Sequence, residues 1–391
     1  MKTSAALTCP SPADRFSLWG AVAEHSVALV LPACTLLFLI TGPHSAANAL
    51  WWTMPVWLFI LADMFSPPDR GRLSADLPAW PFDALLYLLA LLQLANIALM
   101  VRMVAGLGWD DASTIVASVC NLLAIRVLVG TNSCCSGIAV AHELIHRRDA
   151  FPRWLGRLLL VTVSYTHFAV EHLRSHHRHV GTREDPATAH WGESYRAYWR
   201  RTKWAQLRNA WRLENERLGL HGVVPLSSRW LRHEGLLGLL AQLLLWVVIT
   251  HYSGASGLVI FLLQSLAAVR LLEAVNYFQH WGLERASDGL DAWVTDSWFT
   301  HHAFIGLARH ADHHRHGGKP YHQLSLCKQG PKLPYGYFGT AVLAKTFNRR
   351  FQRIARAELQ RYRGRPPRPP EAAFTGSGLT SRNPSHGASS P

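Results

Sequence analysis

The feature that most constrains this chain is a set of long apolar windows, each close to the length that crosses a lipid bilayer. The windows cover residues 26–42, 48–65, 81–104, 113–140, 235–252 and 256–278. A transmembrane helix needs about 20 predominantly apolar residues, and none of the windows shows the two-residue alternation of a strand. Because a helix satisfies its own backbone hydrogen bonds in lipid, the windows predict an all-α integral membrane protein with about six transmembrane helices.

Charge supports this fold class and indicates an orientation. Only 16% of the residues are charged, against ~25% in soluble domains. The loops at 43–47, 105–112 and 253–255 contain no lysine or arginine, whereas the segment 147–234 is rich in arginine. The positive-inside rule therefore places both termini and this basic segment in the cytoplasm. The net charge of +14 is distributed as in cytoplasmic loops, which argues against a nucleic-acid-binding surface.

The chain divides into three regions. Residues 1–25 form an N-terminal cytoplasmic segment, and residues 26–345 form the membrane-embedded domain. Residues 346–391 are basic and then rich in Pro, Gly and Ser, which predicts a largely disordered tail. The six cysteines form no C-x-x-C pair, so we expect no rubredoxin-type site or iron–sulfur cluster within the chain.

One further apolar stretch, residues 153–172, has the length of a span but is interrupted by Arg157 and His167. If it crossed the bilayer, His146 and His172 would lie about 30 Å apart on opposite faces. We therefore expect an interfacial or re-entrant helix here.

Histidines gather in four clusters, all on the predicted cytoplasmic side. The clusters read HELIH, EHLRSHH, NYFQHWG and RHADHH, and their nine histidines are His142, His146, His172, His176, His177, His280, His310, His313 and His314. On a helix, positions three or four apart share a face, so H-x-x-x-H and H-x-x-H can each chelate a metal. A directly adjacent histidine lies about 100° around the helix, where it can reach a second ion or the other side of the same ion.

The identity of the metal depends on the number of ligands. HELIH alone is the H-E-x-x-H signature of a zinc peptidase, with Glu143 as general base. One tetrahedral zinc takes four ligands, however, and nine imidazoles exceed that by a factor of two or more. Two ions with open positions use nine histidines readily, and a site at the mouth of an apolar bundle suits redox iron acting on a lipid-soluble substrate. His301 and His302 receive no assigned role.

Nearby acids are expected to orient the imidazoles through their second nitrogens. The candidates are Glu143, Glu171, Asp185, Glu273 and Asp312. Glu273, Asn276 and His280 lie on one face of the last window. A structural alternative for Glu273 is an ion pair with Arg270 that fastens two helices. No carboxylate stands where it would obviously bridge two irons, so we expect a wider metal spacing than in carboxylate-bridged centres.

The four clusters resemble the motifs HELxH, EHxxxHH, NYxxHxG and RHxxHH of the membrane-bound alkane hydroxylases and the related xylene-type monooxygenases. These enzymes belong to the fatty acid desaturase-like superfamily. Flanking text, namely EDPATAHWGES, AWRLENERLGLHG and LPYGYFG, is similar as well, and the resemblance runs from the second window to about residue 345. It implies a six-helix membrane fold in which the nine histidines hold two non-haem iron ions, with dioxygen as co-substrate for hydroxylation of a hydrocarbon.

The resemblance also implies partners and leaves alternatives open. Electrons would come from a separate rubredoxin, or from a ferredoxin and ferredoxin reductase, and the enzyme would lie in a bacterial inner membrane with its site facing the cytoplasm. Gln279 stands where many alkane hydroxylases have an acid, which favours the xylene-type branch. A fatty acid desaturase, a terminal-alkene-forming decarboxylase and an intramembrane zinc peptidase remain alternatives. Trp51, Met54 and Trp57 are candidates for the substrate channel.

Overall fold

The computed structural model describes residues 18–69, 77–220, 227–285, 292–327 and 329–364. In these ranges the protein is helical and contains no strand, only two isolated bridges. The all-α prediction is therefore confirmed. The predicted tail from residue 365 onward lies outside the described residues, although the basic segment before it forms α17 (Asn348–Arg363).

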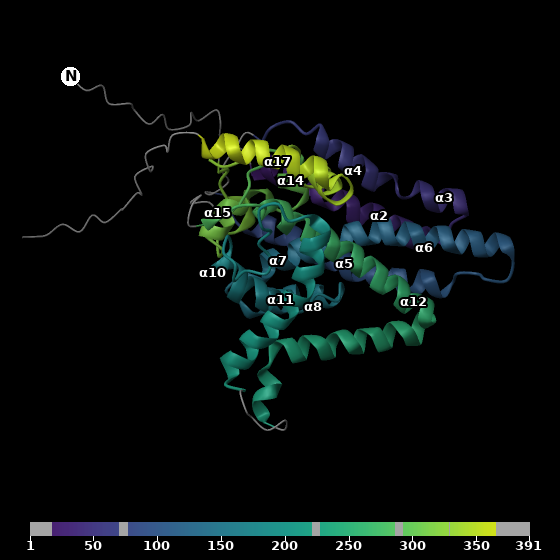
Figure 1. Ribbon diagram of the computed structural model, residues 1–391. Helices are drawn as coiled ribbons and strands as arrows, with labels where there is room; N and C mark the ends of the chain where they lie inside the picture. Colours follow the sequence, from purple (N-terminus) through teal and green to yellow (C-terminus); the bar gives the residue numbers. More distant parts are fainter. Residues whose placement is uncertain (1–17, 70–76, 221–226, 286–291, 328, 365–391) are drawn as a thin grey trace, which may run out of the picture.

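Figure 1 shows a bundle of long helices with a cap of short helices and loops at one end. The bundle contains α1 (Leu18–His25), η2 (Ser26–Leu29), α2 (Val30–Thr41), α3 (Ala46–Trp51), α4 (Met54–Met64), α5 (Trp80–Ala105), α6 (Ala112–Asn132) and α12 (Glu234–His280). The cap contains α7 (Val140–Ile145), α8 (Ala150–Val161), α9 (Phe168–Glu171), η4 (His172–His176), α10 (His177–His179), α11 (Tyr195–Leu218), η5 (Ser228–Arg232), α14 (Trp298–Ala303), η6 (Leu307–Arg309), α15 (His310–Arg315), η7 (Tyr321–Gln323) and α16 (Tyr337–Thr346).

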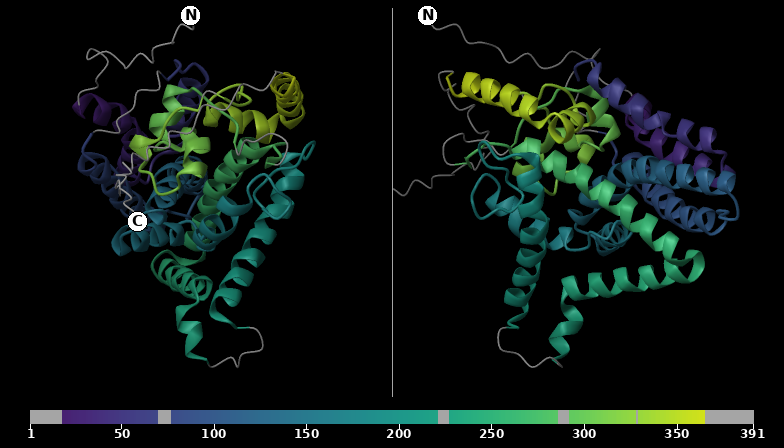
Figure 2. Two further views of the ribbon diagram at one scale, coloured as in Figure 1. Left: turned by 90° about the vertical axis from the view of Figure 1, so that its left-hand side faces the viewer. Right: turned by 45° about the vertical axis from the view of Figure 1, so that its right-hand side comes forward.

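Four helical segments in the described part of the chain are long and apolar enough to cross a membrane. They are Leu18–Thr41, Trp80–Ala105, Ala112–Ile145 and Glu234–His280. The last is 47 residues long and bends at Gly254, whose φ of 65° and ψ of −167° are not helical. Figure 2 shows the two halves of α12 diverging from this bend. They correspond to the fifth and sixth predicted windows.

The first two windows differ from their predicted bounds. Helix begins at Leu18 rather than at residue 26, so part of the predicted N-terminal segment belongs to the first helical run. The second window is divided into α3 and α4, neither of which reaches the length of a span. The number of spans and their orientation therefore stay predictions.

Close packing of α6 against α12 brings two histidine-bearing parts of the chain together. A Cβ on Gly130 of α6 would lie 2.7 Å from the Cβ of Ala267 on α12 and 3.2 Å from the Gln264 carbonyl. Only glycine permits this approach of the two backbones. Helix α6 continues through a π-helical segment, η3 (Ser133–Ala139), into α7, which carries the HELIH motif.

The stretch 153–172 does not form one continuous helix. Helix α8 ends at Val161, and α9 begins at Phe168 after a turn. The ring nitrogens of His146 and His172 lie 3.0 Å apart. The stretch therefore does not place the two histidines on opposite faces of a bilayer, in agreement with the sequence-based expectation.

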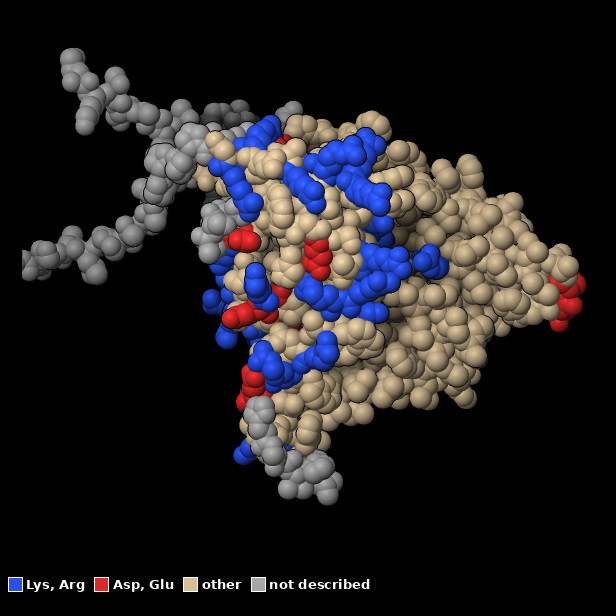
Figure 3. Space-filling view, viewed as in Figure 1, with Lys and Arg blue, Asp and Glu red and all other residues tan. Residues whose placement is uncertain are grey.

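Lysine and arginine side chains gather at the cap end of the molecule, while the surface of the bundle is almost free of them (Figure 3). Helix α11 belongs to this basic cap. Its buried side chains recur every three or four residues from Tyr195 through Tyr198 and Thr202 to Glu214, which gives the helix one inward face. Its other side chains leave an arginine-rich surface beside the histidine clusters.

Candidate metal centre

The nine predicted histidines lie together in two neighbouring groups. The five-histidine group consists of His142, His146, His172, His177 and His313, and the four-histidine group consists of His176, His280, His310 and His314. Within each group, one nitrogen of every ring lies within 4.8 Å of one nitrogen of every other ring. The four sequence clusters, spread over 173 residues from His142 to His314, therefore form one compact region.

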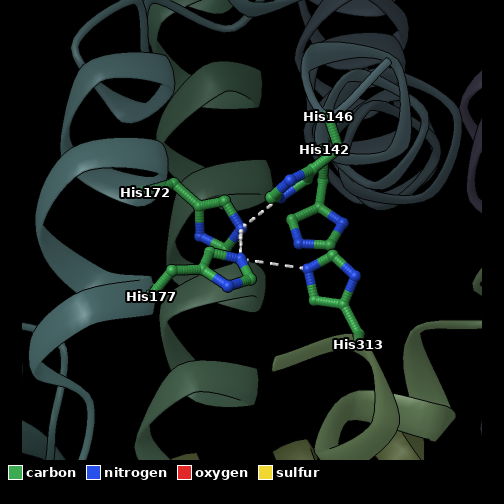
Figure 4. Close-up of side chains that lie close together, drawn as sticks. All are labelled: His142, His146, His172, His177 and His313. Atoms are coloured by element: carbon green, nitrogen blue, oxygen red, sulfur yellow. Dashed lines mark hydrogen bonds between the residues drawn. The ribbon is translucent and has the colours of Figure 1, made fainter. Parts of the chain in front are cut away.

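The rings of the five-histidine group point toward a common centre (Figure 4). His172 Nε2 lies 3.0 Å from the Nε2 atoms of both His146 and His177. His177 Nε2 lies a further 3.1 Å from His313 Nε2. The ring of His142 has its centroid 4.4 Å from the centroids of both His172 and His313.

A π-helical turn explains which histidines of EHLRSHH belong together. In an α-helix, His172 and His176 would share a face, and the sequence predicted that pair as a chelate. The structure instead places His172 and His176 in different groups, and it likewise divides the H-x-x-H pair of His310 and His313. Residues His172–His176 form a π-helical turn, in which residues five apart align. His172 therefore pairs with His177, and His176 points into the four-histidine group.

The four-histidine group draws on the end of α12 and on α15. His310 Nε2 lies 3.0 Å from His314 Nε2 and 3.3 Å from His280 Nε2. The ring centroid of His176 lies 4.9 Å from those of His280 and His314. In both adjacent pairs, 176–177 and 313–314, one histidine belongs to each group.

The nitrogen contacts fit a bound cation better than a network of hydrogen bonds. An imidazole nitrogen carries either one hydrogen or one lone pair. His172 Nε2 and His310 Nε2, however, each lie near two other ring nitrogens. For metal–nitrogen bonds of about 2.1 Å, two ligands at right angles would be about 3.0 Å apart. The observed spacings of 3.0–3.3 Å match this value.

Burial keeps these rings in the form that binds metals. It lowers the pKa of His146 to about 4 and, together with the neighbouring His146, lowers that of His177 to about 2. His142 Nε2 and His176 Nε2 are buried and have no hydrogen-bond partner among the described residues. Neutral imidazoles with inward-facing nitrogens are ligands for first-row transition metals.

Asp185 is the one predicted acid that contacts a ring of the two groups directly. Its Oδ2 lies 2.9 Å from His176 Nδ1 and accepts a hydrogen bond from the Thr188 hydroxyl. Burial opposes ionisation of Asp185, but His176 and Thr188 outweigh it and hold the pKa of the carboxyl below its ordinary value. The charge in turn raises the pKa of His176 against the effect of burial. This contact turns His176 Nε2 toward the other three rings.

Three other predicted acids have different partners. Glu143 forms an ion pair with Arg147 at 2.9 Å and accepts a hydrogen bond from the Tyr321 backbone N–H. Asp312 contacts His316 and Lys319 on the outer side of α15. Glu171 accepts a hydrogen bond from Asn209, and burial raises the pKa of its carboxyl to about 7.

Glu273 lies at the centre of a separate polar cluster. Its buried carboxylate accepts hydrogen bonds from the hydroxyls of Tyr165 and Tyr198 and from the amides of Gln206 and Asn276. The alternative of an ion pair between Glu273 and Arg270 is wrong: the Arg270 guanidinium instead stacks over the Trp199 ring, 5.6 Å from its centroid. Tyrosine and glutamine donors satisfy the carboxylate from α11 and the α8–α9 turn, an arrangement that sequence spacing did not indicate.

Two of the three predicted channel residues, Trp51 and Trp57, lie at the surface of the described part of the chain, and a channel role for them stays a prediction. Trp51 and Trp57 are 73% and 52% exposed, on the outer surface of α3 and α4. Exposed tryptophans on apolar helices are typical of residues facing lipid. A cavity of about 340 Å³ does lie beside α4, but Val56 and Ile60 line it, together with Arg270 and Lys345 from other helices.

The structure also reveals a histidine group that the sequence analysis left unassigned. His25, His301 and His302 are buried, and one nitrogen from each lies within 4.8 Å of one from each of the others. The adjacent pair 301–302 was the available signal. Its partner His25 lies in the N-terminal helix, and spacing alone did not connect the two.

A helical bundle with two groups of converging imidazoles defines a membrane protein with a histidine-rich metal centre. Comparison with known proteins gives the family. Residues 117–340, which include all four histidine clusters, match the model of the fatty acid desaturase family, and the chain belongs to that family.

The chain is also similar to three curated relatives. It is 39% identical over 225 residues to alkane 1-monooxygenase 1 of Pseudomonas aeruginosa, covering 55% of this chain and 58% of that protein. It is 35% identical over 264 residues to alkane 1-monooxygenase 2 of the same species, covering 65% and 69%. It is 26% identical over 203 residues to the xylene/toluene monooxygenase hydroxylase component XylM of Pseudomonas putida, covering 50% and 54%. The matches thus span about half to two thirds of these relatives and confirm the resemblance that the motifs predicted.

Proposed function

We propose that this protein is a membrane-bound di-iron monooxygenase that hydroxylates an unactivated C–H bond of an alkane, an alkylbenzene or another lipid-soluble substrate. The observation that carries the proposal is the division of nine histidines into two adjacent groups of five and four. The similarity to alkane 1-monooxygenases and to XylM supports the reaction class. A terminal methyl group is the favoured position of attack, because it is the position named in the alkane 1-monooxygenase relatives.

The two groups would hold one iron ion each. When bound, the iron pair supplies redox chemistry in which dioxygen, two electrons and two protons convert R–H into R–OH and water. The chain contributes the remaining functions. The imidazoles fix the position of the ions, Asp185 orients His176, and the apolar helices deliver a hydrophobic substrate from the bilayer.

The contacts of Glu143 count against the zinc peptidase alternative. A peptidase needs this carboxylate at the metal as a general base. Here Arg147 and the Tyr321 backbone bind it, and the two histidines of HELIH lie among three further imidazoles. A catalytic zinc site has three protein ligands and an open position for water, and the five histidines of this group exceed that number.

We further propose that electrons arrive from a separate acidic donor, a rubredoxin or a ferredoxin served by its reductase. The basic cap beside the histidine groups (Figure 3) is a surface with complementary charge. Reduction rates should then fall as ionic strength rises, and a flat salt series would contradict electrostatic docking. The proposal includes a bacterial inner membrane with the cap on the cytoplasmic side.

Product analysis tests the proposed function most directly. Cells that express the full chain with either donor system would be fed n-alkanes, alkylbenzenes and fatty acids, and the membranes would be assayed for iron. Alcohols that carry one oxygen atom from ¹⁸O₂ support the proposal. Terminal alkenes or unsaturated acids as sole products would instead support the desaturase or decarboxylase alternatives.

A further inference from the structure

The histidine group formed by His25, His301 and His302 shares no residue with the two groups of the proposed di-iron centre. It joins parts of the chain that are far apart in sequence. His25 ends α1, whereas the other two residues lie in α14, eight and nine residues before His310. Helix α14 packs against α1 and η2. We call these three residues the N-terminal histidine group.

The N-terminal histidine group has the burial of a metal site. The three residues are 7% exposed or less, with His25 at 4% and His302 at 4%. His25 Nδ1 and His301 Nδ1 are buried and have no hydrogen-bond partner in the described part of the chain. An unsatisfied polar atom in the interior is destabilising. A cation bound between the three rings would satisfy one nitrogen of each ring.

The tautomer of His302 also favours a bound cation. Its Nδ1 lies 2.8 Å from the Trp298 carbonyl oxygen. A carbonyl only accepts, so Nδ1 carries the hydrogen and Nε2 of the neutral ring carries a lone pair. That Nε2 lies 3.4 Å from Glu24 Oε2. Two electron-rich atoms facing each other repel unless a cation lies between them, and a hydrogen bond from the second nitrogen to a carbonyl is how proteins usually orient a metal-binding histidine.

The surrounding charge is compatible with a divalent ion. Arg309 lies close to the group, but its guanidinium is paired with Asp69. Burial lowers the pKa of His301 well below its ordinary value, and the Arg309 charge adds to this effect. Burial also lowers the pKa of His302, against the opposing effect of the Trp298 carbonyl. Both shifts favour the neutral imidazole, which is the form that ligates metals.

We propose that the N-terminal histidine group binds one divalent first-row transition ion, with His25, His301 and His302 as ligands and Glu24 completing the site. Three imidazoles and one carboxylate form a tetrahedral set suited to Zn²⁺. The ion joins α1 to α14, so it anchors the segment that leads through η6 into the histidines of α15. This role does not depend on the reaction that the di-iron centre catalyses.

The test uses the iron-loaded full-length protein in detergent, with Zn²⁺ alone as the probe. Iron and zinc are counted together, before and after dialysis, in the wild type, His25→Phe, His301→Asn and the exposed-histidine control His316→Ala. We expect the wild type and the control to retain about one zinc per chain that both variants lack, with iron unchanged in all four. Zinc-edge X-ray absorption of the wild type should show three imidazole nitrogens and a carboxylate oxygen.

Two results would overturn the proposal. One is a wild type that retains no more zinc than His301→Asn. The other is retained zinc that lacks an imidazole shell. If the variants fail to fold, which their iron content and melting temperature would reveal, the zinc retention and X-ray absorption of the wild type still decide the question.

Discussion

The five-histidine and four-histidine groups are assembled from shared segments yet differ in their surroundings. Both draw on the η4–α10 segment and on α15. Helix α7 completes the first group, and the end of α12 completes the second. Only the four-histidine group has a carboxylate directly against one of its rings, through Asp185 and His176, among the contacts that the structure describes. An anionic partner makes an imidazole a stronger donor.

This difference indicates unequal roles for the two proposed irons. An octahedral ion held by the five imidazoles would keep one open position, whereas one held by the four would keep two. The four-histidine group would therefore leave more positions for exchangeable ligands, and the Asp185 carboxylate beside His176 would offset part of the charge of a bound ion. Among the described residues, the two groups consist of histidines alone. The expectation that no acid bridges the metals stays a prediction.

The largest effect should follow removal of one ligand from either group. His313→Ala in the five-histidine group and His310→Ala in the four-histidine group should each reduce hydroxylation to the background level. Each variant should also lose about one of two irons, because the remaining group keeps its own ligands. Iron counting beside the product assay checks this. His316→Ala, whose side chain is 60% exposed, is the matched control and should retain both irons. Equal loss of both irons in either variant would show that the groups form a single site.

Replacement of iron by zinc should separate stability from activity. Zinc can occupy imidazole sites but has no redox chemistry, so the zinc-loaded protein should be inactive as an oxygenase. Its melting temperature should stay above that of the metal-free protein, since binding to the folded state contributes stability. Thermal melting and product analysis on the three forms provide the measurement. Peptidase activity supported by zinc alone would reverse the assignment.

A smaller effect should follow Asp185→Asn, and it should fall on one group only. Loss of an outer carboxylate partner typically weakens metal affinity about 10–100-fold. We therefore expect weaker iron binding in the four-histidine group and unchanged binding in the five-histidine group. Competition with a chelator gives the two affinities. The matched variant Asp312→Asn changes a carboxylate that contacts Lys319 and His316, and it should leave both affinities close to wild type. An equal loss of iron affinity in both groups of the Asp185→Asn variant would contradict the proposed difference between them.

The sequence predicted the fold class and family better than the geometry of the site. Fold class and family followed from apolar windows and motif order, because both depend on local composition. The assignment of His172 and His177 to one group depends on a π-helical turn, and helix periodicity alone predicts His176 instead. Backbone irregularities of this kind arise from tertiary packing, which a local pattern does not encode.

Contacts between residues far apart in the sequence could not be predicted from local patterns either. Glu273 was correctly expected to lie near Asn276, three residues away. Its hydroxyl partners Tyr165 and Tyr198 come from segments 108 and 75 residues distant. The N-terminal histidine group joins residues 25 and 301 in the same way. Only the folded chain brings such positions together.

The smallest predicted effect concerns Glu273, which lies two helical turns before His280 on α12. Tyr198→Phe removes one of four donors to its buried carboxylate. We expect a loss of about 1–3 kcal/mol in the free energy of unfolding, because a buried acceptor loses a partner. Iron affinity should stay unchanged in both groups if Glu273 only fastens α11 to α12. Denaturant unfolding and chelator competition on the same samples separate the two roles. Weaker iron binding in the four-histidine group alone would show instead that Glu273, like Asp185, positions a ligand, and that two carboxylates rather than one distinguish this group from its neighbour.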